Sequence, residues 1–226
     1  LASKLSHEYL LELQDRAIRG SPILFDEARR LFQLTNDQDL RNLFSIARDV
    51  ANKRHGKHID FYYTSKHFPA VSITGAYCDL NCRHCRRKLL EGLTPATSPE
   101  KFINLCEKLS NSGAKGVLIT GGCLSDGKVP IARFLDAIDK VKKRTNLILI
   151  AHTGLINFNK ARRMVDAGLD GVALDVVGSP ETTKAIYGIE ISPGDYVDSL
   201  KALAKAGMPI ISPHVCVGLH FGKLKG

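Results

Sequence analysis

Three cysteines stand close together in the segment SITGAYCDLNCRHCRRK. Cys78, Cys82 and Cys85 fall within eight residues, and no fourth cysteine lies nearby in the sequence. A disulfide needs only two cysteines, and a structural zinc site takes four protein ligands. Three thiolates instead suit a metal centre in which one coordination position is left for another molecule. A zinc site completed by a distant fourth ligand, such as His84 or Cys123, is the alternative.

Composition narrows the classes of protein to which this chain can belong. Its 226 residues are 44% hydrophobic and 24% charged, which is typical of one sizeable soluble α/β domain with an extension. No apolar run is long enough to span a bilayer, and the start of the chain lacks the hydrophobic stretch of a signal peptide. We therefore expect a cytoplasmic protein whose cysteines stay reduced.

The net charge of +9 raises the question of nucleic-acid binding. Most lysines and arginines are scattered along expected helices, where solvated surfaces account for them. One group stands apart beside the cysteines: Arg83, Arg86, Arg87 and Lys88. These cations would offset the negative charge of a thiolate-bound cluster, so nucleic acid is not the expected partner.

The first part of the chain has only helical patterns. Apolar residues at helical spacing predict helices over 4–19, 23–34 and 37–53, the second with Ser21 as its N-cap before a proline. We interpret residues 1–66 as an all-helical N-terminal extension.

From residue 67 the pattern changes to alternating strands and helices. The expected strands AVSIT, GVLITGG, LILIAHTG, GVALDVVG and PIISPHVCVGL are near-continuous apolar runs, as buried parallel strands are. The helices between them end at Gly113, Gly168 and Gly207. Such βα alternation predicts a partial TIM-like (β/α) barrel over 67–226. A closed barrel would need at least one more βα unit, so we expect this barrel to be incomplete at its C-terminus.

Polar residues stand where the expected strands end. The first strand leads into the cysteine segment, the second ends in TGGC, and His152 and Asp175 end the third and fourth. His214, Cys216 and His220 lie on or after the fifth. Because active groups of parallel α/β folds gather at the carboxyl ends of the strands, we expect these residues to converge on one rim.

The C-x3-C-x2-C pattern in the loop after the first strand of a βα barrel resembles the radical S-adenosylmethionine (SAM) superfamily. The resemblance implies that Cys78, Cys82 and Cys85 hold three irons of a [4Fe–4S] cluster and that SAM chelates the fourth. In this family the cluster reduces SAM to methionine and a 5′-deoxyadenosyl radical, which takes hydrogen from unactivated carbon. A ferredoxin-like protein would supply the electron.

The same resemblance assigns roles to residues around the cysteines. His84 takes the place of an aromatic residue that lies against adenine, and the TGG turn resembles the one that binds the methionyl amino group. Cys123 replaces the acidic residue that usually follows this turn. The segment LDVVGSPE points to Asp175 as the ribose contact, and VGLHFG to a glycine near adenine. The implied cosubstrate-binding residues are His84, Thr120, Gly121, Gly122, Asp175 and Gly218.

Within the superfamily, the helical extension and the segment SPETTKAIYG resemble the biotin synthase branch. HFPAVSITGAYCDLNCRHC, AHTGL and PHVCVGLHFG are most similar to the archaeal two-protein lipoyl synthases. This resemblance implies sulfur insertion into an octanoyl chain on an acyl-carrier domain, with a homologous partner subunit. Another biotin-synthase-like reaction, namely rearrangement, methylation or biotin-type sulfur insertion, is the alternative. A metal-bearing scaffold that binds nucleic acid is the non-enzymatic one.

Sulfur insertion in this branch uses a second iron–sulfur cluster as the sulfur source. Three cysteines remain as ligand candidates. Cys106 lies on the apolar side of an expected helix and fits a buried small hydrophobe. Cys123 and Cys216 lie at strand ends, so they are the candidate ligands of a second cluster.

Overall fold

The structure is a computed structural model that describes residues 5–59 and 66–225. Contacts within the chain divide it into two compact units, 1–62 and 63–226. Each unit is described by itself below.

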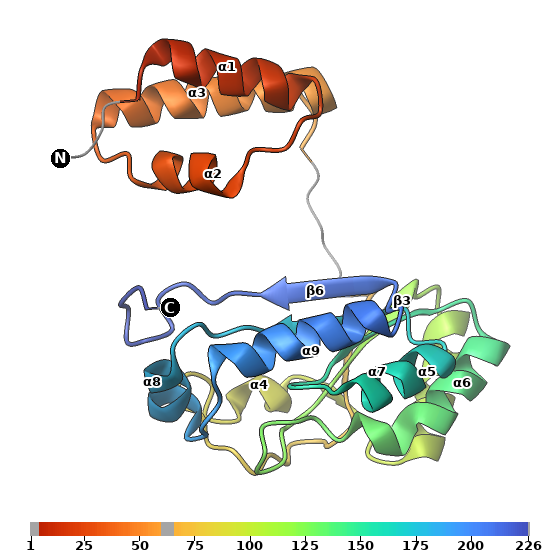
Figure 1. Cartoon of the computed structure of the whole chain (residues 1–226). Coiled ribbons are helices and arrows are strands. Elements are labelled where there is room, and N and C mark those ends of the chain that lie inside the picture. The colour runs from red at the N-terminus through yellow and green to blue at the C-terminus, as the bar shows by residue number, and fades with distance from the viewer. Residues whose placement is uncertain (1–4, 60–65, 226) are drawn as a thin grey trace. The chain divides into compact units, whose positions relative to one another are not determined.

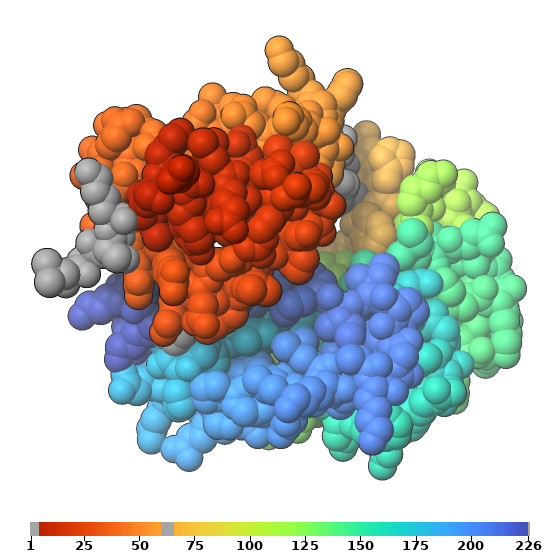
Figure 2. Space-filling model, turned by 45° about the horizontal axis from the view of Figure 1, so that its top comes forward, coloured from red at the N-terminus to blue at the C-terminus, as the bar shows by residue number. Residues whose placement is uncertain are grey.

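The N-terminal unit consists of helices. The helices are α1 (His7–Ile18), α2 (Phe25–Phe32) and α3 (Asp37–His55). Helices α1 and α3 lie side by side (Figures 1 and 2), with Leu10, Leu13 and Ile46 buried. Side-chain oxygens of Ser6 and Asn36 cap the N-termini of α1 and α3 by accepting hydrogen bonds from backbone N–H groups of the first turn.

The start of α2 differs from the sequence prediction. Ser21 is not its N-cap, because the helix begins at Phe25 and Leu24 occupies the N-cap position. The Glu27 carboxylate accepts a hydrogen bond from the backbone N–H of Leu24 at 2.7 Å. It also binds the Arg16 guanidinium of α1 at 2.5 and 3.2 Å. The acidic side chain of the first turn thus takes the place of a hydroxyl cap. The sequence prediction, which relied on the proline after Ser21, placed the N-cap about one helical turn too early.

The second unit is built on one parallel sheet. Its strands are β1 (Ala70–Ser72), β2 (Thr94–Pro95), β3 (Gly116–Thr120), β4 (Ile148–His152), β5 (Gly171–Asp175) and β6 (Ile210–His214). Their order is β2-β1-β3-β4-β5-β6, every pairing is parallel, and the sheet does not close on itself (Figure 1). The prediction of a partial TIM-like barrel is confirmed.

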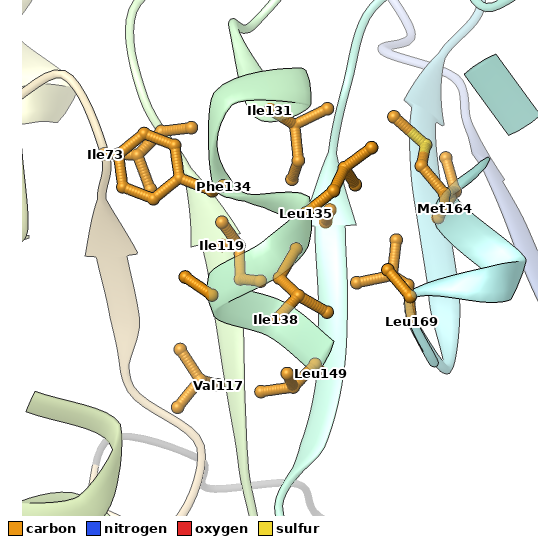
Figure 3. Packing of buried hydrophobic residues seen from close by; sticks show 14 of the residues in the cluster. Ile73, Val117, Ile119, Ile131, Phe134, Leu135, Ile138, Leu149, Met164 and Leu169 are labelled. Carbon is orange, nitrogen blue, oxygen red and sulfur yellow. The ribbon is translucent and has the colours of Figure 1, made fainter. Parts of the chain in front are cut away.

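Helices connect successive strands. They are α4 (Lys88–Glu91), α5 (Pro99–Asn111), the 3₁₀ turn η1 (Ile131–Phe134), α6 (Leu135–Arg144), α7 (Phe158–Asp166), α8 (Pro180–Thr182), the π-helical turn η2 (Thr183–Tyr187) and α9 (Pro193–Lys205). Figure 3 shows Val117, Ile119 and Leu149 of the strands meeting Phe134 and Ile138 of the helical layer. Burial of this apolar face holds the helices on the sheet.

Three details of this unit differ from the prediction. The two-residue strand β2 was missed, because its residues Thr94 and Pro95 carry no alternating or apolar pattern. Of the helices expected between the strands, the one after β3 begins with a 3₁₀ turn, and the last strand ends at His214 rather than continuing through Leu219. The Ser98 hydroxyl caps α5 by accepting a hydrogen bond from the Lys101 N–H.

Alternation along the strands determines which residues reach the site. Val117, Ile119, Leu149, Ala151 and Val172 belong to the core against the helices. Because successive strand side chains point to opposite faces, Thr120, His152, Ala173, Asp175, Ser212 and His214 share the other face. The described helices include none that is both long and apolar enough to cross a membrane.

Candidate active site

The cysteine segment and the carboxyl ends of the strands line one cavity. Its volume is about 250 Å³. The predicted site residues that line it are Cys78, Cys82, His84, Cys85, Thr120, Gly121, Gly122, Cys123, His152 and Asp175. The expected convergence on one rim is therefore observed for these residues.

A hydrogen-bonded contact with the end of β3 fixes the start of the cysteine loop. The Thr74 hydroxyl accepts a hydrogen bond from the Gly122 N–H at 2.6 Å. The backbone of Cys123 makes two more contacts: its N–H donates to Cys78 Sγ at 3.3 Å, and its carbonyl accepts from the Asp79 N–H at 2.8 Å. These bonds join residues almost fifty positions apart in the sequence and place Cys78 against the glycine turn.

Gly122 is required by the close approach of the loop. A Cβ at this position would lie 2.0 Å from the Tyr77 carbonyl oxygen and 2.5 Å from Cys78 Cβ. No side chain fits there unless the loop moves. The glycines of the TGG turn thus have a structural role beside the cosubstrate-binding role that the resemblance implies.

The far end of the loop rests on the turn η2. The Arg83 N–H donates to the Ile186 carbonyl at 2.8 Å, and the Arg87 Nε donates to the Leu80 carbonyl at 3.1 Å. Arg86 and Arg87 have φ values of 47° and 65°, in the left-handed region that non-glycine residues rarely adopt. The loop therefore makes a strained reversal directly after Cys85.

Burial affects the ionisation of the thiols. Burial first, and then the neighbouring Cys85 and Cys78, raise the pKa of Cys82 to about 11. Burial also raises the pKa of Cys123 to about 12, with Cys78 as the next cause. Both thiols hold their protons at neutral pH without a metal, so a metal that binds Cys82 would displace its proton.

His84 lies between the cysteines and the turn η2. Donor atoms of Cys82, His84 and Cys85 lie within 4.8 Å of one another, whereas Cys78 belongs to no such group among the described residues. The His84 ring meets Tyr187 edge to face, with centroids 5.2 Å apart. Partial burial lowers the pKa of His84 and the nearby Asp175 carboxylate opposes this, so the ring is neutral at pH 7.

The tyrosines Tyr187 and Tyr196 also line the cavity, and sequence reasoning did not single them out. Burial, and next the Asp175 charge, raise the pKa of both hydroxyls, that of Tyr196 to about 12. Both residues therefore present neutral hydroxyls. Tyr187 belongs to the segment SPETTKAIYG, which resembles the biotin synthase branch, whereas Tyr196 carried no sequence signal beyond its aromatic side chain.

Four other residues expected at this site do not line the cavity: His214, Cys216, Gly218 and His220. Gly218 is in the turn beyond β6 with φ 79°, and Cys216 is exposed. Neither Cys123 nor Cys216 belongs to a group of three ligand residues whose donor atoms lie within 4.8 Å, as far as the described residues go. Cys106 is fully buried in the core of the sheet and helices.

A comparison with protein families bears directly on this loop and cavity. The family model described as "Radical SAM superfamily" matches residues 72–222, about two thirds of the chain and the whole of the cavity lining. The chain belongs to the radical SAM superfamily. This membership supports a [4Fe–4S] cluster and SAM as the groups that the site takes.

Curated relatives agree with this assignment. The chain is 22% identical over 213 residues to a biotin synthase of Clostridium tetani, covering 90% of this chain and 62% of that protein. It is 29% identical over 138 residues to a probable GTP 3′,8-cyclase of Methanothermobacter marburgensis, covering 58% of this chain and 41% of that protein. The chain thus spans about three fifths of the length of the biotin synthases it matches.

Solved structures share the fold of this radical SAM protein. A crystal structure of HydG, a maturase of the [FeFe]-hydrogenase, gives a TM-score of 0.69 at 18% identity and covers 96% of this chain and 49% of that one. Methylornithine synthase (PylB) gives 0.60 at 19% identity, covering 92% and 59%. At these identities the likeness concerns the fold alone.

The donor set fits the iron–sulfur cluster of the superfamily. Three thiols line one cavity, and Thr120, Gly121 and Gly122 at the end of β3 line the same cavity. The Cys123 N–H already points at Cys78 Sγ, and N–H···S hydrogen bonds are one of the factors that set cluster potentials. The zinc alternative needs Cys78, Cys82 and Cys85 on one ion, but among the described residues these three thiols do not all lie within 4.8 Å of one another.

Proposed function

We propose that this chain is the radical SAM core of an enzyme that inserts sulfur at unactivated C–H positions of an octanoyl chain carried by an acyl-carrier domain. When bound, a cluster on Cys78, Cys82 and Cys85 supplies the electron that cleaves SAM to a hydrogen-abstracting 5′-deoxyadenosyl radical. The observation that carries the proposal is the cavity in which these three thiols meet the TGG turn and Asp175.

Different residues of the cavity would bind different parts of SAM. In this proposal the Gly121 and Gly122 carbonyls accept hydrogen bonds from an amino group, because the Thr120 carbonyl already accepts from the Ile73 N–H and the Gly122 N–H is already bound to Thr74. The Asp175 carboxylate on the same cavity can accept hydrogen bonds from a pair of hydroxyls, as a ribose presents. The flat His84 ring offers a surface for an adenine.

The apolar part of the cavity supports an alkyl substrate. Hydrophobic side chains from α4, its flanks and the turn after η2 line it: Leu80, Leu89, Leu90, Leu93, Ile189 and Ile191. An acyl chain would be stabilised by burial against these residues and would be kept from water during a radical step.

A basic surface beside the cavity supports an acidic carrier domain. Arg83, Arg86, Arg87 and Lys88 are all exposed, and Arg87 also lines the cavity. Together with the net charge of +9, these cations favour encounter with an acidic partner. A homologous partner subunit and a ferredoxin-like donor complete the proposal.

The test is anaerobic reconstitution with iron and sulfide in the presence of the homologous partner subunit, followed by dithionite, SAM and an octanoylated carrier peptide. We expect 5′-deoxyadenosine and a peptide whose mass increases by added sulfur. The Cys78→Ala, Cys82→Ala, Cys85→Ala triple variant should form no 5′-deoxyadenosine. Cys106→Ala is the matched control, because its thiol is buried in the core and should leave 5′-deoxyadenosine formation intact.

Two results would separate the parts of this proposal. Formation of 5′-deoxyadenosine without sulfur on the peptide, with the partner subunit present, would retain radical SAM chemistry and exclude the octanoyl substrate. A reconstituted chain that binds zinc but no iron would overturn the whole proposal.

A further inference from the structure

Two histidines and one carboxylate meet on the cavity face of the sheet. His152, Asp175 and His214 end the neighbouring strands β4, β5 and β6, and Asp175 pairs with His214 in the sheet register. His152 and Asp175 also line the cavity of the cysteines. The iron–sulfur cluster of the proposed function uses neither imidazole, so it does not explain why His152, Asp175 and His214 lie together.

The separations of the donor atoms match those of metal ligands. His152 Nε2 and His214 Nδ1 lie 3.4 Å apart, and His214 Nδ1 lies 3.7 Å from Asp175 Oδ1. All three donor atoms are within 4.8 Å of one another. Ligands held at about 2.0–2.1 Å from a tetrahedral zinc ion are about 3.3–3.4 Å apart. A small inward movement of the three side chains would therefore fill three of the four positions of a tetrahedral ion.

A second contact supports this arrangement independently. The Ser212 hydroxyl lies 3.2 Å from His214 Nε2, on the side of the ring opposite to the shared point. If Nε2 donates to this hydroxyl, Nδ1 keeps its lone pair and faces His152 and Asp175. Metal-binding histidines are commonly oriented by such a bond from the other ring nitrogen.

We propose that His152, Asp175 and His214 bind one divalent cation of the zinc or iron(II) type, at a site distinct from the three cysteines. Two imidazoles and one carboxylate leave coordination positions open, as in catalytic rather than structural metal sites. The open side faces the shared cavity, so the cation would bind an anionic oxygen or a sulfur donor of the molecule held there.

Asp175 is the one residue that this site shares with the proposed SAM site. A carboxylate has two oxygens and can bind a cation with one and accept a hydrogen bond with the other. The experiment therefore uses the histidines, which the proposed SAM site does not need.

The probe is Co²⁺, added to the Cys78→Ala, Cys82→Ala, Cys85→Ala variant so that no cluster thiolate competes. We expect visible d–d absorption bands that saturate at one cation per chain. His152→Ala and His214→Ala, added singly to this variant, should each abolish the saturable phase. Ser212→Ala should weaken Co²⁺ binding about 10- to 100-fold.

His55→Ala is the matched control, because His55 is an exposed histidine at the end of α3 in the other unit. It should leave the titration unchanged. Circular dichroism checks that each variant folds, and if the triple variant does not, zinc content per chain is compared by mass spectrometry between the reconstituted wild-type chain and its histidine variants.

The proposal is wrong if the folded protein shows no saturable phase, or if His152→Ala and His214→Ala bind as the parent does. The result of the cobalt titration does not depend on whether the proposed function is correct. The variant without cluster thiolates cannot make 5′-deoxyadenosine but should still bind cobalt, whereas the wild-type chain can make 5′-deoxyadenosine whether or not this cation binds.

Discussion

Replacing Gly122 by alanine should remove the cluster without removing a ligand. The new Cβ would lie 2.0 Å from the Tyr77 carbonyl oxygen and 2.5 Å from Cys78 Cβ, where ordinary contact begins at 3.4 Å. The loop must therefore retreat by about 1.4 Å at Tyr77 and about 0.9 Å at Cys78. Catalytic sites tolerate displacements of about 0.5 Å, and an error of 1 Å can cost about 100-fold in rate.

The assay is iron content after anaerobic reconstitution, together with the rate of 5′-deoxyadenosine formation. We expect Gly122→Ala to lose most of its iron, or to keep it and form 5′-deoxyadenosine about 100-fold more slowly. Gly92→Ala is the control, because its added Cβ would meet nothing within 4 Å and its φ of −89° suits any residue. If Gly122→Ala keeps both its iron and its rate, the contact between the glycine turn and Cys78 does not position the cluster ligand.

Three further changes test the stability of the two units. Because the Arg16 hydrogen bond lowers the pKa of Glu27, Glu27→Gln should reduce amide protection of α1 and α2 at pH 7, and this difference should shrink as the pH falls below about 4.5. Phe102→Ala empties a fully buried position and should lower the free energy of unfolding by about 3–5 kcal/mol in urea titrations. Asp170→Ala removes the acceptor of Lys142 Nζ, at 2.7 Å, and should cost about 1–3 kcal/mol in the same titrations.

Each of these changes has a matched control on an exposed position. Glu12→Gln removes one negative charge from α1, Val197→Ala shortens a side chain that is 46% exposed, and Asp198→Ala removes an exposed carboxylate. Each should change stability by less than about 0.5 kcal/mol. Equal losses in a variant and its control would show that the contact in question contributes nothing specific.

The sequence was sufficient for the features that depend on local pattern. Apolar runs predicted five of the six strands, and the spacing of the cysteines indicated the family. The short strand β2 carried no such pattern, because Thr94 and Pro95 pair with β1 only through tertiary placement. The turn at Ser21 resembled a helix start, but Glu27 supplies the acceptor at Leu24 instead.

In the site, too, local pattern predicted some features, whereas others depend on tertiary contacts. His152 and Asp175 could be predicted at the rim, because they end their strands and the carboxyl ends of parallel strands lie at the same edge of a sheet. The approach of His214 Nδ1 to both of them could not be predicted, because it depends on sheet register and side-chain rotamers. The contribution of Tyr187 depends on the turn η2, which lies within the segment SPETTKAIYG; that segment indicated a branch of the family but gave Tyr187 no role in the site.

The order of the cysteine loop is explained by contacts that involve no metal. Its first half is held by Thr74 and by the backbone of Cys123, and its second half by the Ile186 carbonyl. A loop held at both ends loses little further entropy when a cluster binds, because its backbone is already ordered. Of the strained residues after Cys85, Arg87 is held by the hydrogen bond from its Nε to the Leu80 carbonyl. It follows that the strand ends, and not the cysteine motif alone, determine where the vacant iron position would face: into the cavity shared with Asp175.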